Sequence, residues 1–194
     1  LLVGLLWLSQ PLAALEVKVV LPEQGVDDKL KAFAAKSEAL LKEWEPKVAE
    51  ALVNAKRLVL YAGQGVHYAK AWNELKAVAE LLEAPVTTSL EGKSAFPETH
   101  ALSMGSGGVA MPRAVAAYVE ESDMVFGVGA SFTATGFGIR FPTKNKTFVH
   151  NTIDPYDIDK NIPAEYPLLG DSKLTLEMLY DALKDRLKKP RGLT

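Results

Sequence analysis

The chain has 194 residues, of which 48% are hydrophobic and 24% charged, and its formal net charge at pH 7 is −2. These values are typical of a globular domain with a full hydrophobic core, and the slightly acidic balance argues against a nucleic-acid-binding surface. The absence of cysteine excludes disulfides, thiolate metal sites and thiol nucleophiles, and it favours a cytoplasmic protein.

Residues 1–14 form a short apolar segment that has two interpretations. The segment resembles the apolar core of a signal peptide, but it lacks a positive leading region. It is also too short to span a membrane, which needs about 20 apolar residues. We therefore favour the other interpretation, in which residues 1–26 are a terminal strand and linker from a preceding domain. A single α/β domain is then expected over residues 27–190.

Strand and helix patterns alternate along the rest of the chain. Amphipathic spacing predicts a helix over residues 27–45, and Pro46 can start a second helical segment that ends near residue 54. On the last predicted helix we expect Asp171 as the N-cap and Leu174 on the inner side. The remaining elements are predicted as strand 58–62, helix 68–83, strand 85–89, helix 110–121, strand 124–128, strand 147–153, a short strand near 167–169 and helix 172–188.

This alternation of strands and helices predicts the fold class. Right-handed crossovers between parallel strands give a three-layer α/β/α domain with a roughly six-stranded, Rossmann-like parallel sheet. Ligands of such sheets bind outside the carboxyl ends of the strands. The residues directly after each predicted strand are therefore the candidates for ligand contact.

Glycine and hydroxyl residues follow several of the strands. Gly63-Gln64-Gly65 lies between a strand and a helix, where free N–H groups and the helix dipole favour phosphate, although a tight turn also explains it. Residues 105–108 are either a diphosphate-binding loop or an ordinary loop, and residues 127–132 leave room for a flat nucleotide. Asp154 either hydrogen-bonds a ribose or an adenine, or caps its own turn. Together these segments indicate a nucleotide-binding domain.

The sequence shows no catalytic or metal centre. The three histidines are far apart and have no ligand spacing. Glu91, Lys93, Glu98 and His100 are the polar residues best suited to chemistry, but they do not form a recognisable acid–base set. We expect Lys93 and Glu98 to make surface or interdomain contacts.

Taken together, these segments resemble the central domain of thiamine diphosphate-dependent enzymes of the acetolactate synthase, pyruvate oxidase and benzoylformate decarboxylase type. The resemblance covers about residues 46–187 and rests on AKRLVLYAGQGV, AWNELKAVAELLEAPVTTSLEGKSAFPETHAL, ESDMVFGVGASF and VHNTIDPYDIDKNIPAEYPLLGDSKLTLEML. In this family the domain holds FAD, ADP or no nucleotide. By position, the residues implied to contact FAD or ADP are Gly63, Gln64, Gly65, Ser89, Leu90, Glu91, Gly105, Ser106, Gly107, Gly108, Gly129, Ala130, Ser131, Thr152, Ile153, Asp157, Asp171 and Ser172.

One departure from the family concerns the nucleotide. FAD-binding acetolactate synthases carry an Arg-Phe-Asp-Asp-Arg string where this chain has Ser131-Phe132-Thr133-Ala134-Thr135. The two arginines that would hold a flavin phosphate by bidentate hydrogen bonds are therefore missing. Arg140 can compensate only if its loop folds back.

The resemblance also implies what the parent protein does. It would be a 2-keto-acid decarboxylase or carboligase, in which thiamine diphosphate and magnesium are held by an N-terminal and a C-terminal domain that this chain does not match. We therefore expect neither catalytic residues nor metal ligands here, and no turnover by this chain alone.

The implied partners are the missing pyrimidine- and diphosphate-binding domains of the same parent chain, in a homodimer or homotetramer. We expect no nucleic acid and no membrane among the partners. The alternative function is a stand-alone, non-catalytic nucleotide-binding or scaffold module that uses the same glycine loops.

Overall fold

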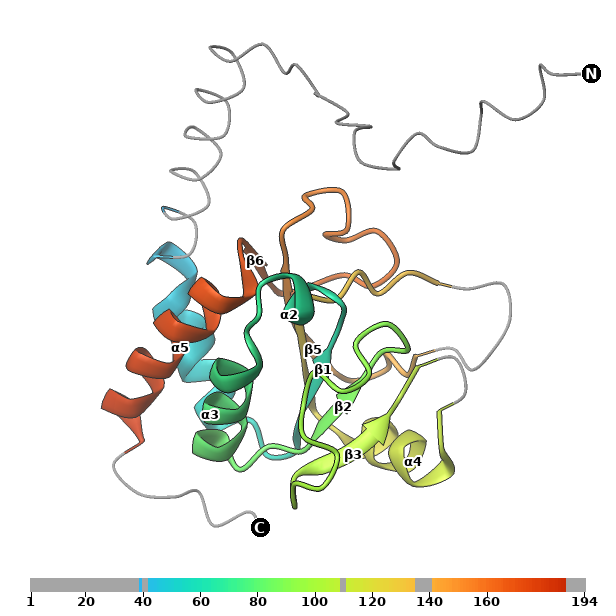
Figure 1. Ribbon diagram of the computed structural model, residues 1–194. Coiled ribbons are helices and arrows are strands. Elements are labelled where there is room, and N and C mark those ends of the chain that lie inside the picture. The colour runs from blue at the N-terminus through green and yellow to red at the C-terminus, as the bar shows by residue number, and fades with distance from the viewer. Residues whose placement is uncertain (1–38, 40–41, 109–110, 135–140, 188–194) are drawn as a thin grey trace, which may run out of the picture. The chain divides into compact units, whose positions relative to one another are not determined.

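The computed structural model describes residue 39 and the ranges 42–108, 111–134 and 141–187 (Figure 1). Four of the predicted features lie outside these residues: the terminal strand, most of the helix predicted over residues 27–45, Arg140, and residue 188, the predicted end of the last helix. Within the described part, no helix has the length and apolar character that a membrane crossing requires.

The core of the fold is one parallel sheet of six strands in the order β3-β2-β1-β4-β5-β6. This order reverses between β1 and β4, so the loops that follow these two strands begin side by side. The predicted α/β fold with a parallel, Rossmann-like sheet is thereby confirmed. The strands are Leu58–Ala62 (β1), Val86–Thr88 (β2), Ser103–Ser106 (β3), Met124–Val128 (β4), Thr147–Thr152 (β5) and Tyr166–Leu169 (β6).

Helices cover both faces of the sheet (Figure 1). Leu58 and Leu60 of β1 are buried under the helical residues 42–54, α3 and α5, whereas Val59 and Tyr61 are buried on the face that α4 covers. Central parallel strands are buried on both faces in this way, which explains their continuous apolar sequence. The helices are Gly65–Tyr68 (α2), Trp72–Leu82 (α3), Arg113–Glu121 (α4) and Ser172–Arg186 (α5).

The structure corrects the predicted elements in three places. The predicted glycine loop 105–108 begins inside β3, where Gly105 has a φ of 75° and the pairing with β2 shifts register. Such a shift is a β-bulge, which glycine favours. The helix predicted over 68–83 begins later, as α3 at Trp72, and the separate short helix α2 precedes it. Leu174 is 59% exposed rather than on the inner face of α5. Asp171 is the N-cap of α5 as predicted, and its Oδ1 accepts hydrogen bonds from the amides of Lys173 and Leu174.

Candidate functional site

A cavity of about 1120 Å³ opens at the carboxyl edge of the sheet. The loops that follow β1, β2, β4, β5 and β6 line it, together with Gly107, Gly108 and Met111 from the connection between β3 and α4. The cavity therefore lies where the strand order reverses, which is where open parallel sheets bind their ligands.

Most of the site residues predicted from the sequence line this cavity. Gly105 and Ser106 are the exceptions, because they lie in β3 and do not contribute to the wall. Asp154, which the sequence left open between a ligand contact and a turn cap, lines the cavity and also caps its turn by accepting the amide of Tyr156. The predicted residues in the wall are Gly63, Gln64, Gly65, Ser89, Leu90, Glu91, Gly107, Gly108, Gly129, Ala130, Ser131, Thr152, Ile153, Asp157, Asp171 and Ser172.

The cavity has an aromatic wall, and two of its residues, Tyr61 and Phe141, were not identified as site residues from the sequence. The aromatic wall consists of Tyr61, Phe132 and Phe141, with Met111 beside them. The rings of Tyr61 and Phe132 are stacked, with centroids 5.3 Å apart and planes 15° apart, and Phe141 meets both rings edge-on. In the sequence Tyr61 was indistinguishable from a core residue, since it is the fourth residue of a continuous apolar strand. Only the order of the strands brings these rings together.

Phe132 reaches this position through an unusual backbone conformation. Its φ is 46°, in the left-handed region that most side chains avoid, and its ring lies over Gly127, where a Cβ atom would collide with it. The ring also meets the edge of His150 at a centroid distance of 4.9 Å. Gly127 therefore serves aromatic packing within the protein, and the flat surface expected there for a nucleotide is covered by Phe132.

The glycines after β1 and β4 serve loop packing as well. The amide of Gly63 donates to the carbonyl oxygen of Val128 over 2.8 Å, and the amide of Gly65 donates to that of Gly129 over 2.9 Å. A Cβ atom on either glycine would overlap the backbone of Gly129 or Ala130. The two loops approach each other at backbone distance, so these positions cannot hold a side chain.

Asn151, a fully buried residue of β5, joins the loops around the cavity. Its Oδ1 accepts hydrogen bonds from the amide of Gly129 (3.2 Å) and the hydroxyl of Ser172 (2.8 Å). Its Nδ2 donates to the carbonyl oxygens of Leu168 and Gly170 over 3.1 and 3.0 Å. This single amide side chain therefore holds the loop after β4 against β6 and the start of α5.

Two titratable groups next to the cavity have shifted pKa values. Burial, together with the nearby charge of Glu91, raises the pKa of Tyr61 to about 12. Burial lowers the pKa of His150, whose Nε2 donates to the carbonyl oxygen of Ala130 over 2.6 Å. Its Nδ1 has no hydrogen-bond partner among the described residues. His150 is therefore a neutral ring that supports the loop after β4, and Tyr61 stays protonated.

The charged residues that the structure describes in the cavity wall are all acidic. Glu91, Asp154, Asp157 and Asp171 contribute carboxylates, and no lysine or arginine is present among the lining residues that the structure describes. The size of the cavity fits a nucleotide, since ligand cavities usually measure about 300–1000 Å³. Its charge does not fit the phosphate groups, because four carboxylates repel an anion.

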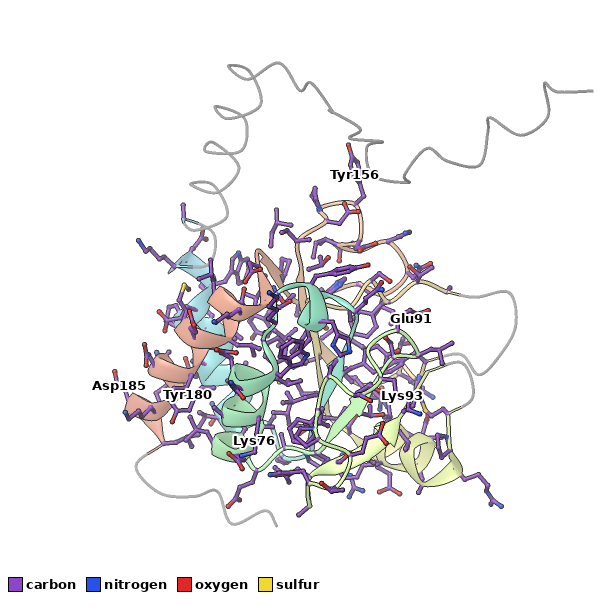
Figure 2. All side chains as sticks on the ribbon, viewed as in Figure 1. Lys76, Glu91, Lys93, Tyr156, Tyr180 and Asp185 are labelled. Atoms are coloured by element: carbon purple, nitrogen blue, oxygen red, sulfur yellow. The ribbon has the colours of Figure 1, made fainter. Side chains whose placement is uncertain are left out.

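The polar residues considered for chemistry do not converge. Glu91 and Lys93 lie on the loop after β2 (Figure 2), but only Glu91 lines the cavity. Glu98 lies 3.4 Å from the hydroxyl of Ser94, and His100 pairs with Glu80 over 3.1 Å. Within the described residues, no three histidine, cysteine or carboxylate side chains are grouped to hold a metal ion.

The matching family model and the curated relatives indicate the same family. The family model described as "Thiamine pyrophosphate enzyme, central domain" matches residues 46–179. The chain is 37% identical over 138 residues to a probable acetolactate synthase large subunit of Methanocaldococcus jannaschii, covering 71% of this chain and 23% of that protein. It is 34% identical over 135 residues to the acetolactate synthase isozyme 3 large subunit of Escherichia coli, covering 69% of this chain and 24% of that protein.

Solved structures have the same fold. A putative thiamin diphosphate-dependent enzyme of Mycobacterium smegmatis superimposes with a TM-score of 0.62 at 29% identity, over 73% of this chain and 28% of the other. A benzoylformate decarboxylase of Polynucleobacter necessarius does so with a TM-score of 0.60 at 23% identity, over 72% of this chain and 26% of the other, and shows the fold alone. This chain spans about a quarter of the length of the relatives that it matches.

Proposed function

Since the chain belongs to the central-domain family of thiamine pyrophosphate enzymes, we propose that it is the central domain of a thiamine diphosphate-dependent 2-keto-acid decarboxylase or carboligase that resembles acetolactate synthase. The observation that carries this proposal is the family match over residues 46–179 together with the 37% identity to an acetolactate synthase large subunit. Thiamine diphosphate and magnesium would be bound by the other domains of the parent, where the cofactor supplies the carbon–carbon chemistry.

The role of this domain would then be architectural and ligand-binding. The cavity at the carboxyl edge is the proposed nucleotide site, and FAD and ADP are the candidate ligands that the family suggests. Support comes from its position over the reversal of strand order and from the sixteen predicted residues that line it.

The proposed partners follow from the family. They are the pyrimidine- and diphosphate-binding domains of the same parent chain and further copies of that parent in a homodimer or homotetramer. A cytoplasmic location is part of the same proposal, and the absence of cysteine supports it because cytoplasmic thiols form few structural disulfides.

The parent's activity is tested on the natural reading frame that contains this chain. We expect that frame to encode flanking domains with an activating glutamate and a Gly-Asp-Gly…Asn motif, and its purified product to release carbon dioxide from pyruvate or another 2-keto acid only when thiamine diphosphate and magnesium are added. A frame that encodes this domain alone would instead support the non-catalytic binding or scaffold module.

The nucleotide site is tested on this chain by calorimetric titration with FAD and ADP. Thr133 is exposed and lines the cavity, so Thr133→Trp should obstruct the cavity while leaving the core unchanged. Thr99→Trp is the matched control, because Thr99 is exposed on a loop away from the cavity wall. We expect Thr133→Trp to abolish binding and Thr99→Trp to leave it intact. Equal binding by both variants would place the nucleotide elsewhere.

A further inference from the structure

The cavity has the size and position of a nucleotide site, but the charge of its wall repels phosphate. We propose that the cavity recognises the heterocycle and the sugar of its ligand and not the phosphates, an inference that rests on the proposed nucleotide site. Uncharged nucleoside-type molecules should then bind more tightly than their phosphorylated forms. The ligand class is thus a flat ring joined to a polyhydroxyl chain, as in adenosine or riboflavin.

Negative charges from two loops surround the cavity. Asp154 and Asp157 enter from the loop after β5, and Glu91 enters from the loop after β2. Lys160 is paired with Asp157 over 3.4 Å and is not itself one of the lining residues. The net charge of the wall therefore stays negative, and each phosphate brought into it adds repulsion.

Four of the glycine amides at the cavity already donate to acceptors within the protein. A phosphate-binding loop needs backbone N–H groups that point at the ligand without a partner. Here the amides of Gly63 and Gly65 donate to the loop after β4, and the amide of Gly107 donates to the carbonyl oxygen of Thr88 over 2.7 Å. The amide of Gly129 donates to Asn151. The loops after β1 and β4 are therefore bonded to each other, and Gly107 is bonded to the end of β2.

The long helix α5 begins at the cavity. A helix start attracts an anion through its free amides and its dipole. The carboxylate of Asp171 occupies this position itself, with Oδ1 2.8 Å from the amide of Lys173 and 3.1 Å from that of Leu174. An incoming phosphate would have to displace a negative group that is built into the chain.

The remaining wall is suited to an uncharged ligand. Tyr61, Phe132 and Phe141 offer apolar ring surface for a heterocycle. Carboxylates accept hydrogen bonds from sugar hydroxyls, so Asp154 and Asp157, which repel phosphate, are favourable partners for a ribose or ribityl chain. The same residues thereby attract one part of a nucleotide and disfavour the other.

The test compares matched ligand pairs by calorimetric titration of the purified chain at low ionic strength: adenosine with ADP, and riboflavin with FAD. We expect the uncharged member of at least one pair to bind at least about tenfold more tightly, and the difference to shrink in 0.5 M salt because screening weakens the repulsion. Tighter or equal binding of both phosphorylated members would overturn this inference and leave the proposed nucleotide site intact. Binding of none of the four ligands would overturn both.

A charge variant tests whether the carboxylates cause the selectivity. Asp154→Asn keeps an oxygen that can accept the amide of Tyr156 but removes the charge. We expect its affinity for the phosphorylated ligands to rise about threefold or more relative to its affinity for the uncharged ones. This is the effect expected when one negative charge, several ångströms from the phosphate in a solvated site, is removed. Glu177→Gln is the matched control, because Glu177 is an exposed carboxylate on α5 outside the cavity wall. An unchanged ratio in Asp154→Asn would contradict the inference.

A last variant addresses Arg140, which precedes the cavity residue Phe141 in the sequence and lies outside the described residues. Arg140→Ala should leave the preference for uncharged ligands unchanged. If the wild-type chain prefers phosphorylated ligands and Arg140→Ala loses that preference, Arg140 supplies the cation and the inference is wrong.

Discussion

The amide of Gly65 donates to the carbonyl oxygen of Gly129 over 2.9 Å, and a Cβ atom at position 65 would lie only 2.7 Å from the Cα of Gly129. Two loops from the centre of the sheet therefore pack backbone against backbone. The glycines that first suggest a ligand site are required by this contact whether or not a ligand is present.

Gly65→Ala should destabilise the chain for this reason. The added methyl group would overlap backbone atoms, which cannot move without shifting the whole loop, so we expect a loss of about 1–3 kcal/mol in the free energy of unfolding. Urea titration followed by circular dichroism measures it. Thr99→Ala is the control, because Thr99 is exposed on a loop and such surface substitutions change stability little. Equal stability of the two variants would show that the loops can separate easily.

Asn151→Ala should be more damaging than a substitution at the cavity rim. It leaves the amide of Gly129 and the carbonyl oxygens of Leu168 and Gly170 without their side-chain partner in a buried position. Each unsatisfied buried group costs about 1–3 kcal/mol, so we expect a total loss of about 3 kcal/mol or more. The matched substitution is Asn161→Ala at an exposed asparagine of the cavity rim. Similar urea midpoints for the two variants would contradict the role assigned to Asn151.

Because His150 is buried, we expect the folded chain to lose stability in weak acid. Its pKa is lowered in the folded chain, whereas an unfolded histidine titrates near about 6.5, so below that pH the unfolded chain binds more protons. The free energy of unfolding should therefore fall as the pH drops below about 6.5, by up to about 1.4 kcal/mol per pH unit from this group, until the folded pKa is reached. Urea titrations between pH 5 and 7 measure this slope, and His150→Gln should reduce it. Parallel slopes for both proteins would refute the assignment.

The hydroxyl of Tyr61 should ionise at an unusually high pH. Its pKa of about 12 lies above the ordinary value of 10.0 because the ring is buried and Glu91 is negative. A spectrophotometric titration should contain a late step that is absent from Tyr61→Phe. Since the unfolded chain releases this proton near pH 10 and the folded chain keeps it, the stability that depends on it should decline between pH 10 and 12. A wild-type titration identical to that of Tyr61→Phe, apart from amplitude, would contradict the shift.

Local patterns predicted most strands and the position of the site. Continuous apolar runs identified β1, β4 and β5, because strands buried on both faces need apolar residues at every position. β3 was missed because SMGS is short, half-buried and interrupted by a bulge glycine. Leu174 was misplaced because the inner face of α5 is set by Leu176, Leu179 and Leu183, whose spacing leaves Leu174 exposed.

The sequence by itself determined the family, the alternation of strands and helices and the edge of the sheet at which the cavity lies, since these depend on residues near one another in the chain. Only the tertiary structure decided what the glycines do. Gly63 and Gly65 lie more than sixty residues from Gly129, and only the pairing of β1 with β4 brings their loops into contact and uses their amides. The same pairing brings Tyr61 against Phe132. A glycine between a strand and a helix has the same local sequence whether its amide meets a phosphate or a neighbouring carbonyl, and the difference arises from contacts that are distant in sequence.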